Sequence, residues 1–226
     1  MLGRSSEKLE TLRQAAPEAG ERLVCELLDI KDGMAFEARL DMWTSRWGRI
    51  SYLVNAAGFL QPGGLLTTSR QSIRDVVETN LLSNLEVSLA VGRHTASERA
   101  GSIVTIGSNS VTTARMGLGA YPASKAGIIH AMKCLGLELA EHGVRCNIVS
   151  PGSTITEMQQ RFQSTTGSRD AVLHGDPKQF RLGIPLRKMA EPQDACDVVL
   201  FLLSDRAGHI TMENTVLDGG ASLGAR

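Results

Sequence analysis

The 226-residue sequence has no excess of charge of either sign and no long hydrophobic run. Its 24 basic residues balance 24 acidic ones, so no field of one sign recruits nucleic acid or an anionic membrane. The apolar runs fall well short of the ~18 residues that a membrane helix needs, and no basic-then-apolar leader opens the chain. We therefore expect a cytoplasmic protein with neither nucleic-acid nor membrane partners.

Cysteine is scarce, with only four residues. They form no Cys-x-x-Cys pair and lie scattered at Cys25, Cys134, Cys146 and Cys196. This spacing argues against a redox motif or a zinc site and favours small hydrophobic residues of the interior. The five histidines are dispersed as well. We expect no metal site.

The composition indicates a single domain of mixed helix and strand, because 42% hydrophobic content in a chain of this length can bury one sizeable core. Short β-rich apolar runs alternate with helical stretches, which predicts a doubly wound α/β fold with a parallel sheet. Strands are expected near 23–29, 50–56, 102–107, 144–150 and 214–218. Helices are expected near 5–15, 33–47, 70–98, 121–141 and 192–204.

Three polar side chains form a candidate catalytic group. Tyr121 and Lys125 lie four residues apart, so they share one face of a helix. An ammonium near a phenol stabilises the phenolate, and a tyrosine whose pKa is lowered toward neutrality serves as a general base. Ser108 follows an apolar run, 102–107, that is typical of a buried strand whose carboxyl end faces a cleft. Taken alone, the pair of Tyr121 and Lys125 equally fits a surface helix.

Five sequence elements follow one another in a fixed order. They are Asp29 after the run 22–28, Asn55-Ala-Ala-Gly58, Asn80 within 78–82, Ser108 with Tyr121 and Lys125, and Pro151-Gly-Ser-Thr-Ile-Thr156. In this order they resemble the short-chain dehydrogenase/reductase family, and the resemblance runs over nearly the whole chain. It implies a Rossmann-like fold and a nicotinamide cofactor, NAD or alternatively NADP.

The resemblance also implies roles for individual residues. The catalytic tetrad would be Asn80, Ser108, Tyr121 and Lys125. Asp29 would lie beside the adenine ring, and Tyr121 and Lys125 would contact the cofactor as well. The remaining cofactor contacts would come from Asn55, Ala56, Gly58, Pro151, Gly152, Thr154 and Thr156.

The amino-terminal part departs from the family pattern. Family members open with a strand, a Thr-Gly-x-x-x-Gly-x-Gly turn and a helix whose amino end holds the pyrophosphate. This sequence begins at Met1-Leu-Gly-Arg4, which is similar to the tail of the family's second strand. The first strand is central in such sheets, so we expect a gap between the strand ending at Asp29 and the one ending at Asn55, with two unpaired edges. We expect a start codon placed late or a truncated gene copy.

Arg4 bears on the choice of cofactor. It lies where an acidic residue selects NAD through the ribose hydroxyls in this family, so Arg4 could instead favour a 2′-phosphate. An ordinary solvated arginine at a helix start is the alternative.

The carboxyl-terminal third resembles a narrower group. The stretches 180–193 and 208–225 are similar to 2,3-dihydro-2,3-dihydroxybenzoate dehydrogenases of catecholate siderophore pathways, and the segment 157–190 corresponds to the family's substrate lid. Arg115 would then bind a carboxylate through two parallel hydrogen bonds. Met158 is a further candidate substrate contact, although it and the lid's Phe162, Phe180 and Met189 fit ordinary packing equally well.

The resemblance implies oxidation of a cyclic dihydrodiol carboxylate with Tyr121 as the general base. Two alternatives stay open. One is a general reductase of ketones or 3-oxoacyl thioesters, and the other is a catalytically impaired remnant. The family usually forms homotetramers through helices near 70–98 and 121–141, and we expect association of this kind.

Overall fold

In the computed structural model, residues 1–166 and 168–225 are described. Their strands are β1 (Leu2–Gly3), β2 (Glu26–Leu27), β3 (Tyr52–Asn55), β4 (Gly101–Ile106), β5 (Val144–Pro151) and β6 (Asn214–Leu217). The α-helices are α1 (Ser6–Ala15), α2 (Gly33–Trp47), α3 (Arg70–Val77), α4 (Asn84–Glu98), α5 (Tyr121–Ala140), α6 (Glu157–Thr166), α7 (Arg169–His174) and α8 (Pro192–Leu203). A π-helix, η2 (Glu78–Ser83), joins α3 to α4, and short 3₁₀ turns are η1 (Pro17–Arg22), η3 (Asn109–Val111), η4 (Pro177–Gln179) and η5 (Asp205–Ala207).

The strands are all parallel, but they form two separate sheets. Strand β1 pairs only with β2, whereas the larger sheet has the order β3-β4-β5-β6. In the part of the chain that the structure describes, no strand pairs with the β3 edge that faces away from β4. The free edge at β3 carries exposed side chains, because Tyr52 is 56% and Val54 is 43% accessible.

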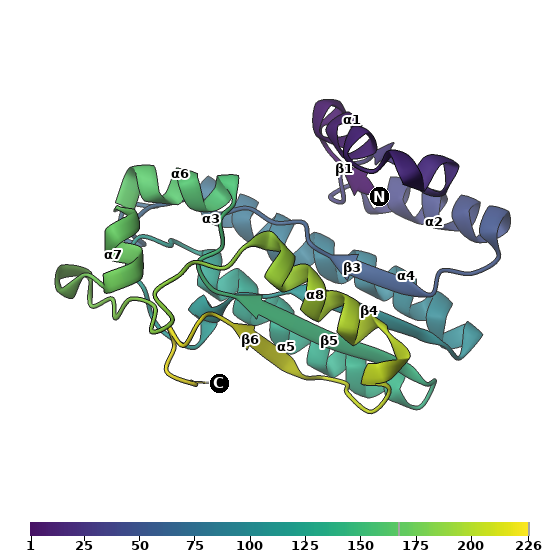
Figure 1. The fold of residues 1–226 in the computed structure, drawn as a ribbon. Coiled ribbons are helices and arrows are strands. Elements are labelled where there is room, and N and C mark those ends of the chain that lie inside the picture. The colour runs from purple at the N-terminus through teal and green to yellow at the C-terminus, as the bar shows by residue number, and fades with distance from the viewer. Residues whose placement is uncertain (167, 226) are drawn as a thin grey trace.

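Helices cover both faces of the larger sheet, as predicted (Figure 1). On one face, Ile128 and Met132 of α5 pack against Ile103 of β4 and Ile148 of β5 in a fully buried cluster. On the other face, α8 packs against β4 and β5 through a second cluster that includes Leu202. This doubly wound arrangement brings the carboxyl ends of the strands to one edge.

The amino-terminal segments form a layer of their own beside α4 (Figure 1, purple). Helix α2 packs Phe36, Leu40 and Trp43 against Val87 and Val91 of α4. Local signals fix the boundaries of α2, because the Asp32 side chain accepts a hydrogen bond from the Ala35 N–H and Gly48 follows with a φ of 86°.

The structure differs from the sequence-based expectations in three segments. The strand expected at 23–29 is only Glu26–Leu27, because its partner β1 offers two residues to pair with. The helix expected at 70–98 is interrupted by the π-helix η2. The segment 157–190, in which no helix or strand was expected, contains α6 and α7.

Candidate active site

The three predicted catalytic residues come together at the carboxyl edge of the larger sheet. Tyr121 is the first residue of α5, Lys125 lies one turn later, and Ser108 follows the end of β4. All three line a cavity of about 880 Å³. The cavity also extends along α8, where Leu200 and Leu203 contribute to its wall.

Lys125 is buried in this cavity wall, with 5% of its surface accessible. Its Nζ donates a hydrogen bond of 2.7 Å to the main-chain oxygen of Ile106. Burial lowers the pKa of the Lys125 ammonium to about 8. The side chain therefore remains mainly protonated at neutral pH but gives up its proton far more readily than a solvated lysine.

The pKa of Tyr121 differs in direction from the expectation. Burial raises it, and a hydrogen bond with Ser108 lowers it by a smaller amount. The expected depression by Lys125 is wrong for the protein without a bound cofactor, because the ammonium lies 5.9 Å from the centre of the phenol ring and is engaged by Ile106. Removal of water from around the phenol raises the Tyr121 pKa by more than the Ser108 hydrogen bond lowers it.

Asn80 lies in the π-helix η2 and is fully buried. Its Nδ2 donates to the Phe59 carbonyl at 2.9 Å and to Ser124 Oγ at 3.1 Å, and its Oδ1 accepts from the Phe59 N–H at 2.9 Å. Both donor positions are therefore occupied. The side chain joins the loop after β3 to α5, while the π-helix changes the hydrogen-bonding pattern of the main chain around it.

The loop after β3 lies directly against the catalytic side chains. A Cβ added at Gly58 would lie 3.1 Å from Asn80 Oδ1 and 3.5 Å from Lys125 Nζ, so this close approach requires glycine. Gly58 and Ala56 line the cavity, as expected. Asn55 does not line it, because its Nδ2 donates to Ser88 Oγ at 2.6 Å and Thr105 Oγ1 at 3.1 Å and thereby ties β3 to α4 and β4.

The turn after β5 forms the opposite wall. Pro151, Gly152, Thr154 and Thr156 all line the cavity. A Cβ at Gly152 would lie 2.7 Å from the Cβ of Asp218, so the turn packs closely against the segment after β6.

The residues expected at the adenine end of the cofactor lie outside the cavity. Arg4 and Asp29 follow β1 and β2 and form an exposed ion pair of 3.7 Å. Neither lines the cavity. The structure thus brings these two residues together but not to the catalytic group.

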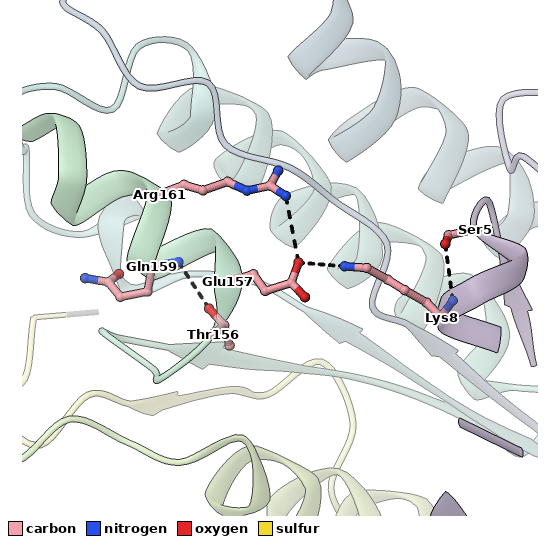
Figure 2. A network of polar contacts seen from close by, with 6 residues as sticks. All are labelled: Ser5, Lys8, Thr156, Glu157, Gln159 and Arg161. Atoms are coloured by element: carbon pink, nitrogen blue, oxygen red, sulfur yellow. Dashed lines mark hydrogen bonds and ion pairs between the residues drawn. The ribbon is translucent and has the colours of Figure 1, made fainter. Parts of the chain in front are cut away.

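An ion pair joins α1 of the amino-terminal layer to α6 (Figure 2). Lys8 Nζ of α1 donates to Glu157 Oε2 of α6 at 2.6 Å, and Arg161 lies 3.8 Å from the same oxygen. Thr156 Oγ1 accepts from the Gln159 N–H and caps α6. Hydrogen bonding and charge from Lys8 hold the pKa of Glu157 below its usual range.

Both predicted substrate contacts line the cavity, Arg115 from the loop before α5 and Met158 from α6. Of the apolar residues of 157–190 named above, Phe162 and Met189 are buried, whereas Phe180 is exposed. Sequence reasoning did not single out Arg181, which also lines the cavity, or Asp218, which accepts a hydrogen bond of 3.0 Å from Asn109. Both lie in stretches that carry the narrower resemblance, and this was their only signal.

The residues that the structure describes include no helix long and apolar enough to cross a membrane. They also contain no group of three or more histidine, cysteine, aspartate or glutamate side chains placed to hold a metal ion.

Comparisons with known proteins find relatives over nearly the whole chain. A family model described as enoyl-(acyl carrier protein) reductase matches residues 2–222. The 2,3-dihydro-2,3-dihydroxybenzoate dehydrogenase of Bacillus subtilis (strain 168) is 41% identical over 218 residues, covering 96% of this chain and 84% of that protein. The Escherichia coli (strain K12) enzyme of the same name is 36% identical over 218 residues, covering 96% and 88%.

Solved structures share the fold. The structure described as ElxO with NADP bound superposes with a TM-score of 0.85 at 24% identity, covering 97% of this chain and 86% of that one. The matched fold, the extent of the family match and the relatives' sequence identity together show that the chain belongs to the short-chain dehydrogenase/reductase family of oxidoreductases.

Proposed function

We propose that the protein oxidises a cyclic dihydrodiol carboxylate, 2,3-dihydro-2,3-dihydroxybenzoate, to 2,3-dihydroxybenzoate with a nicotinamide cofactor. The single observation that carries the reaction type is the placement of Ser108, Tyr121 and Lys125 in one cavity. The choice of substrate rests on the names of the relatives and on Arg115 in the same cavity. The proposed role is in catecholate siderophore synthesis.

Tyr121 acts as the general base in this proposal. It takes the proton of a ring hydroxyl, and Ser108 hydrogen-bonds the same substrate oxygen. Because burial raises the pKa of Tyr121, proton transfer requires a further positive charge or hydrogen bond near the phenol in the loaded enzyme. Lys125 is the nearby cation, and release of its bond to Ile106 would let it approach. The dienone product then tautomerises to the catechol.

A proton leaving Tyr121 needs a route to water. The Asn80 side chain has both donors engaged, so we assign this role to main-chain groups of the π-helix η2 rather than to the amide. Asn80 is then a positioning residue that fixes the loop after β3.

The cavity wall fits the nicotinamide half of a cofactor. Gly58 lets the loop approach closely, Lys125 supplies an ammonium for the ribose, and the turn with Pro151, Gly152, Thr154 and Thr156 lines the opposite side. When bound, the nicotinamide accepts the hydride from the hydroxyl-bearing carbon. We propose NAD, with NADP as the alternative. The negative charge of Asp29 beside Arg4 disfavours a 2′-phosphate.

We also propose that the chain is a single domain of this family, with 157–190 as the substrate lid. Met158, Phe162 and Arg181 of this segment line the cavity, which supports the lid assignment. Assembly into a homotetramer through α4 and α5 is supported by the exposed Leu89 and Leu137 on these helices. A cytoplasmic location completes the proposal.

A reductase of carbonyl or acyl thioester substrates is the second candidate. It is favoured by the description of the matching family model. Arg115→Ala separates the two functions, because this change should weaken carboxylate substrates selectively if Arg115 binds the carboxylate.

The first experiment is calorimetric titration of the purified chain with NAD and with NADP, followed by addition of the dihydrodiol carboxylate. Turnover that Tyr121→Phe abolishes while the circular dichroism spectrum stays unchanged supports the proposal. Undiminished turnover by Tyr121→Phe contradicts it. A folded chain that binds neither nucleotide would indicate the catalytically impaired remnant instead.

A further inference from the structure

Two arginine side chains from separate segments line the cavity that holds Tyr121. Arg115 comes from the loop before α5, and Arg181 comes from the segment after η4. Both are partly buried. The structure therefore places two guanidinium groups beside the catalytic group rather than on the outer surface.

The two charges influence one another. Burial, followed by the charge of Arg115, lowers the pKa of Arg181 to about 10, and Asp176 acts in the opposite direction. Burial also lowers the pKa of Arg115, which Asp218 partly offsets. Both groups nonetheless remain protonated at neutral pH. Two like charges held together out of water are unfavourable, and an anion between them would relieve the repulsion.

The nearby carboxylates do not neutralise these arginines by direct pairing. Asp218 Oδ2 already accepts three hydrogen bonds, from Asn109 Nδ2 and from the N–H and Oγ of Ser222. Within the described residues, no guanidinium nitrogen of Arg115 or Arg181 lies within 4.0 Å of a carboxylate oxygen.

Most of the guanidinium donors are free to bind a ligand. Arg181 Nη2 donates to Ser153 Oγ at 3.1 Å, its one side-chain hydrogen bond to the residues that the structure describes. Arg115 makes no hydrogen bond with any residue in the described ranges. A guanidinium presents five N–H donors in a planar fork that matches a carboxylate.

We propose that Arg115 and Arg181 together bind the carboxylate of the substrate, with Arg181 as a specificity-determining residue supplied by the lid. This inference rests on the proposed function and extends it to a second arginine. With the carboxylate held by guanidinium groups from two segments, the substrate ring has a fixed orientation, which selects the hydroxyl that faces Tyr121. An uncharged ring lacks this anchor.

Binding of the aromatic product tests the inference without requiring turnover. We would titrate 2,3-dihydroxybenzoate and catechol, which differ only by the carboxylate, into the unmodified chain and into Arg115→Gln, Arg181→Gln, the double variant and Arg181→Lys. Lys178→Gln is the matched control, because it removes one positive charge from an exposed side chain of the same segment that lies outside the cavity lining. Circular dichroism and urea unfolding check that each variant folds.

We expect the unmodified chain and Lys178→Gln to prefer 2,3-dihydroxybenzoate over catechol by about tenfold or more, as for charge-assisted hydrogen bonds. Arg181→Gln should lose most of this preference with little change in catechol affinity, and Arg181→Lys should recover part of it. The double variant should lose less than the sum of the single losses, because both arginines bind one group.

The inference is overturned if the unmodified chain shows no preference for the carboxylate, or if folded Arg181→Gln keeps the full preference. It is also overturned if Arg181→Gln weakens only nucleotide or inorganic phosphate binding, which would make the arginines a phosphate site. Turnover is scored separately. Turnover of the dihydrodiol carboxylate that Arg181→Gln leaves unchanged refutes the inference alone, whereas a carboxylate preference without turnover refutes the proposed function alone.

Discussion

The ammonium of Lys125 lies 5.9 Å from the centre of the Tyr121 ring, on the same face of α5. The two groups are neighbours but are not paired, because the ammonium donates its hydrogen bond to the end of β4. A buried charge held by one neutral carbonyl carries a desolvation cost. Burial of the Lys125 ammonium at this position therefore lowers the free energy of unfolding of the protein without cofactor.

Replacing Lys125 by methionine should stabilise the fold at neutral pH by roughly 1–3 kcal/mol while abolishing turnover. The pKa of Lys125 is lowered to about 8 from its ordinary value of 10.5, so between these values the Lys125 side chain binds more protons in the unfolded chain than in the folded one. The contribution of Lys125 to the free energy of unfolding should thus rise with pH across this window, and this rise should be absent in Lys125→Met. Urea unfolding at several pH values measures both effects.

Lys133→Met, a partly exposed position of the same helix, is the matched control for loss of a lysine charge. A Lys125→Met protein that is less stable than the unmodified chain across this pH range would show that the bond to Ile106 outweighs desolvation.

The Tyr121 phenol should ionise above its ordinary pKa of 10.0 in the protein without cofactor, because burial disfavours the phenolate. Ser108→Ala should raise the Tyr121 pKa further, since the Ser108 hydrogen bond lowers it. Phenolate absorbance during an alkaline titration reports this directly, and the chain has only two tyrosines. The titration curve of Tyr121→Phe should lack the absorbance step of Tyr121 and thereby identifies that step in the unmodified chain. A downward shift in Ser108→Ala would be inconsistent with this account.

Asn80→Ala should lower the free energy of unfolding by roughly 2–3 kcal/mol, because it removes three hydrogen bonds, two to the partly buried main chain of Phe59 and one to the buried Ser124. Asn55→Ala, which removes two buried hydrogen bonds, should lower the free energy of unfolding by a smaller amount. Chemical denaturation compares the two variants. Equal stability of Asn80→Ala and the unmodified chain would rule out the positioning role assigned to this amide.

Gly58→Ala should reduce turnover more than it reduces stability. The added methyl group would lie 3.1 Å from Asn80 Oδ1 and 3.5 Å from Lys125 Nζ, so the catalytic side chains must move by a few tenths of an ångström. Gly64→Ala is the control in the same loop, where the first neighbour of an added Cβ is Thr67 Oγ1 at 3.7 Å. Steady-state kinetics and thermal unfolding of both variants test the contrast, which fails if the two lose turnover equally.

Local sequence patterns predicted most elements of the larger sheet and its helices. The apolar run that precedes Ser108 is the central strand β4, and the helical spacing of Tyr121 and Lys125 does place both side chains in one cavity wall. Gly143, with a φ of 72°, lies just past the end of α5, where glycine is common. Such features depend on neighbours in the chain, so periodicity and turn residues are sufficient to find them.

The amino-terminal strands show where local patterns are insufficient. The residues of 23–29 have strand character, yet only Glu26–Leu27 are paired, because a strand extends only as far as its partner. The local sequence pattern likewise did not predict the π-helix at Asn80. The Asn80 side chain is hydrogen-bonded to the loop at Phe59, which is a contact between separate segments.

The sequence by itself determined the fold class and the family and predicted that Ser108, Tyr121 and Lys125 form one group, because these depend on ordered motifs and hydrophobic periodicity. Only the tertiary structure decided the electrostatics of the site. Burial raises the pKa of Tyr121, whereas the sequence had suggested that Lys125 would lower it. The packing of the chain brings Arg181 into the cavity that Arg115 also lines, although the two residues lie in separate segments. Both effects depend on the distances between groups far apart in the chain and on the exclusion of water, which the order of residues does not specify.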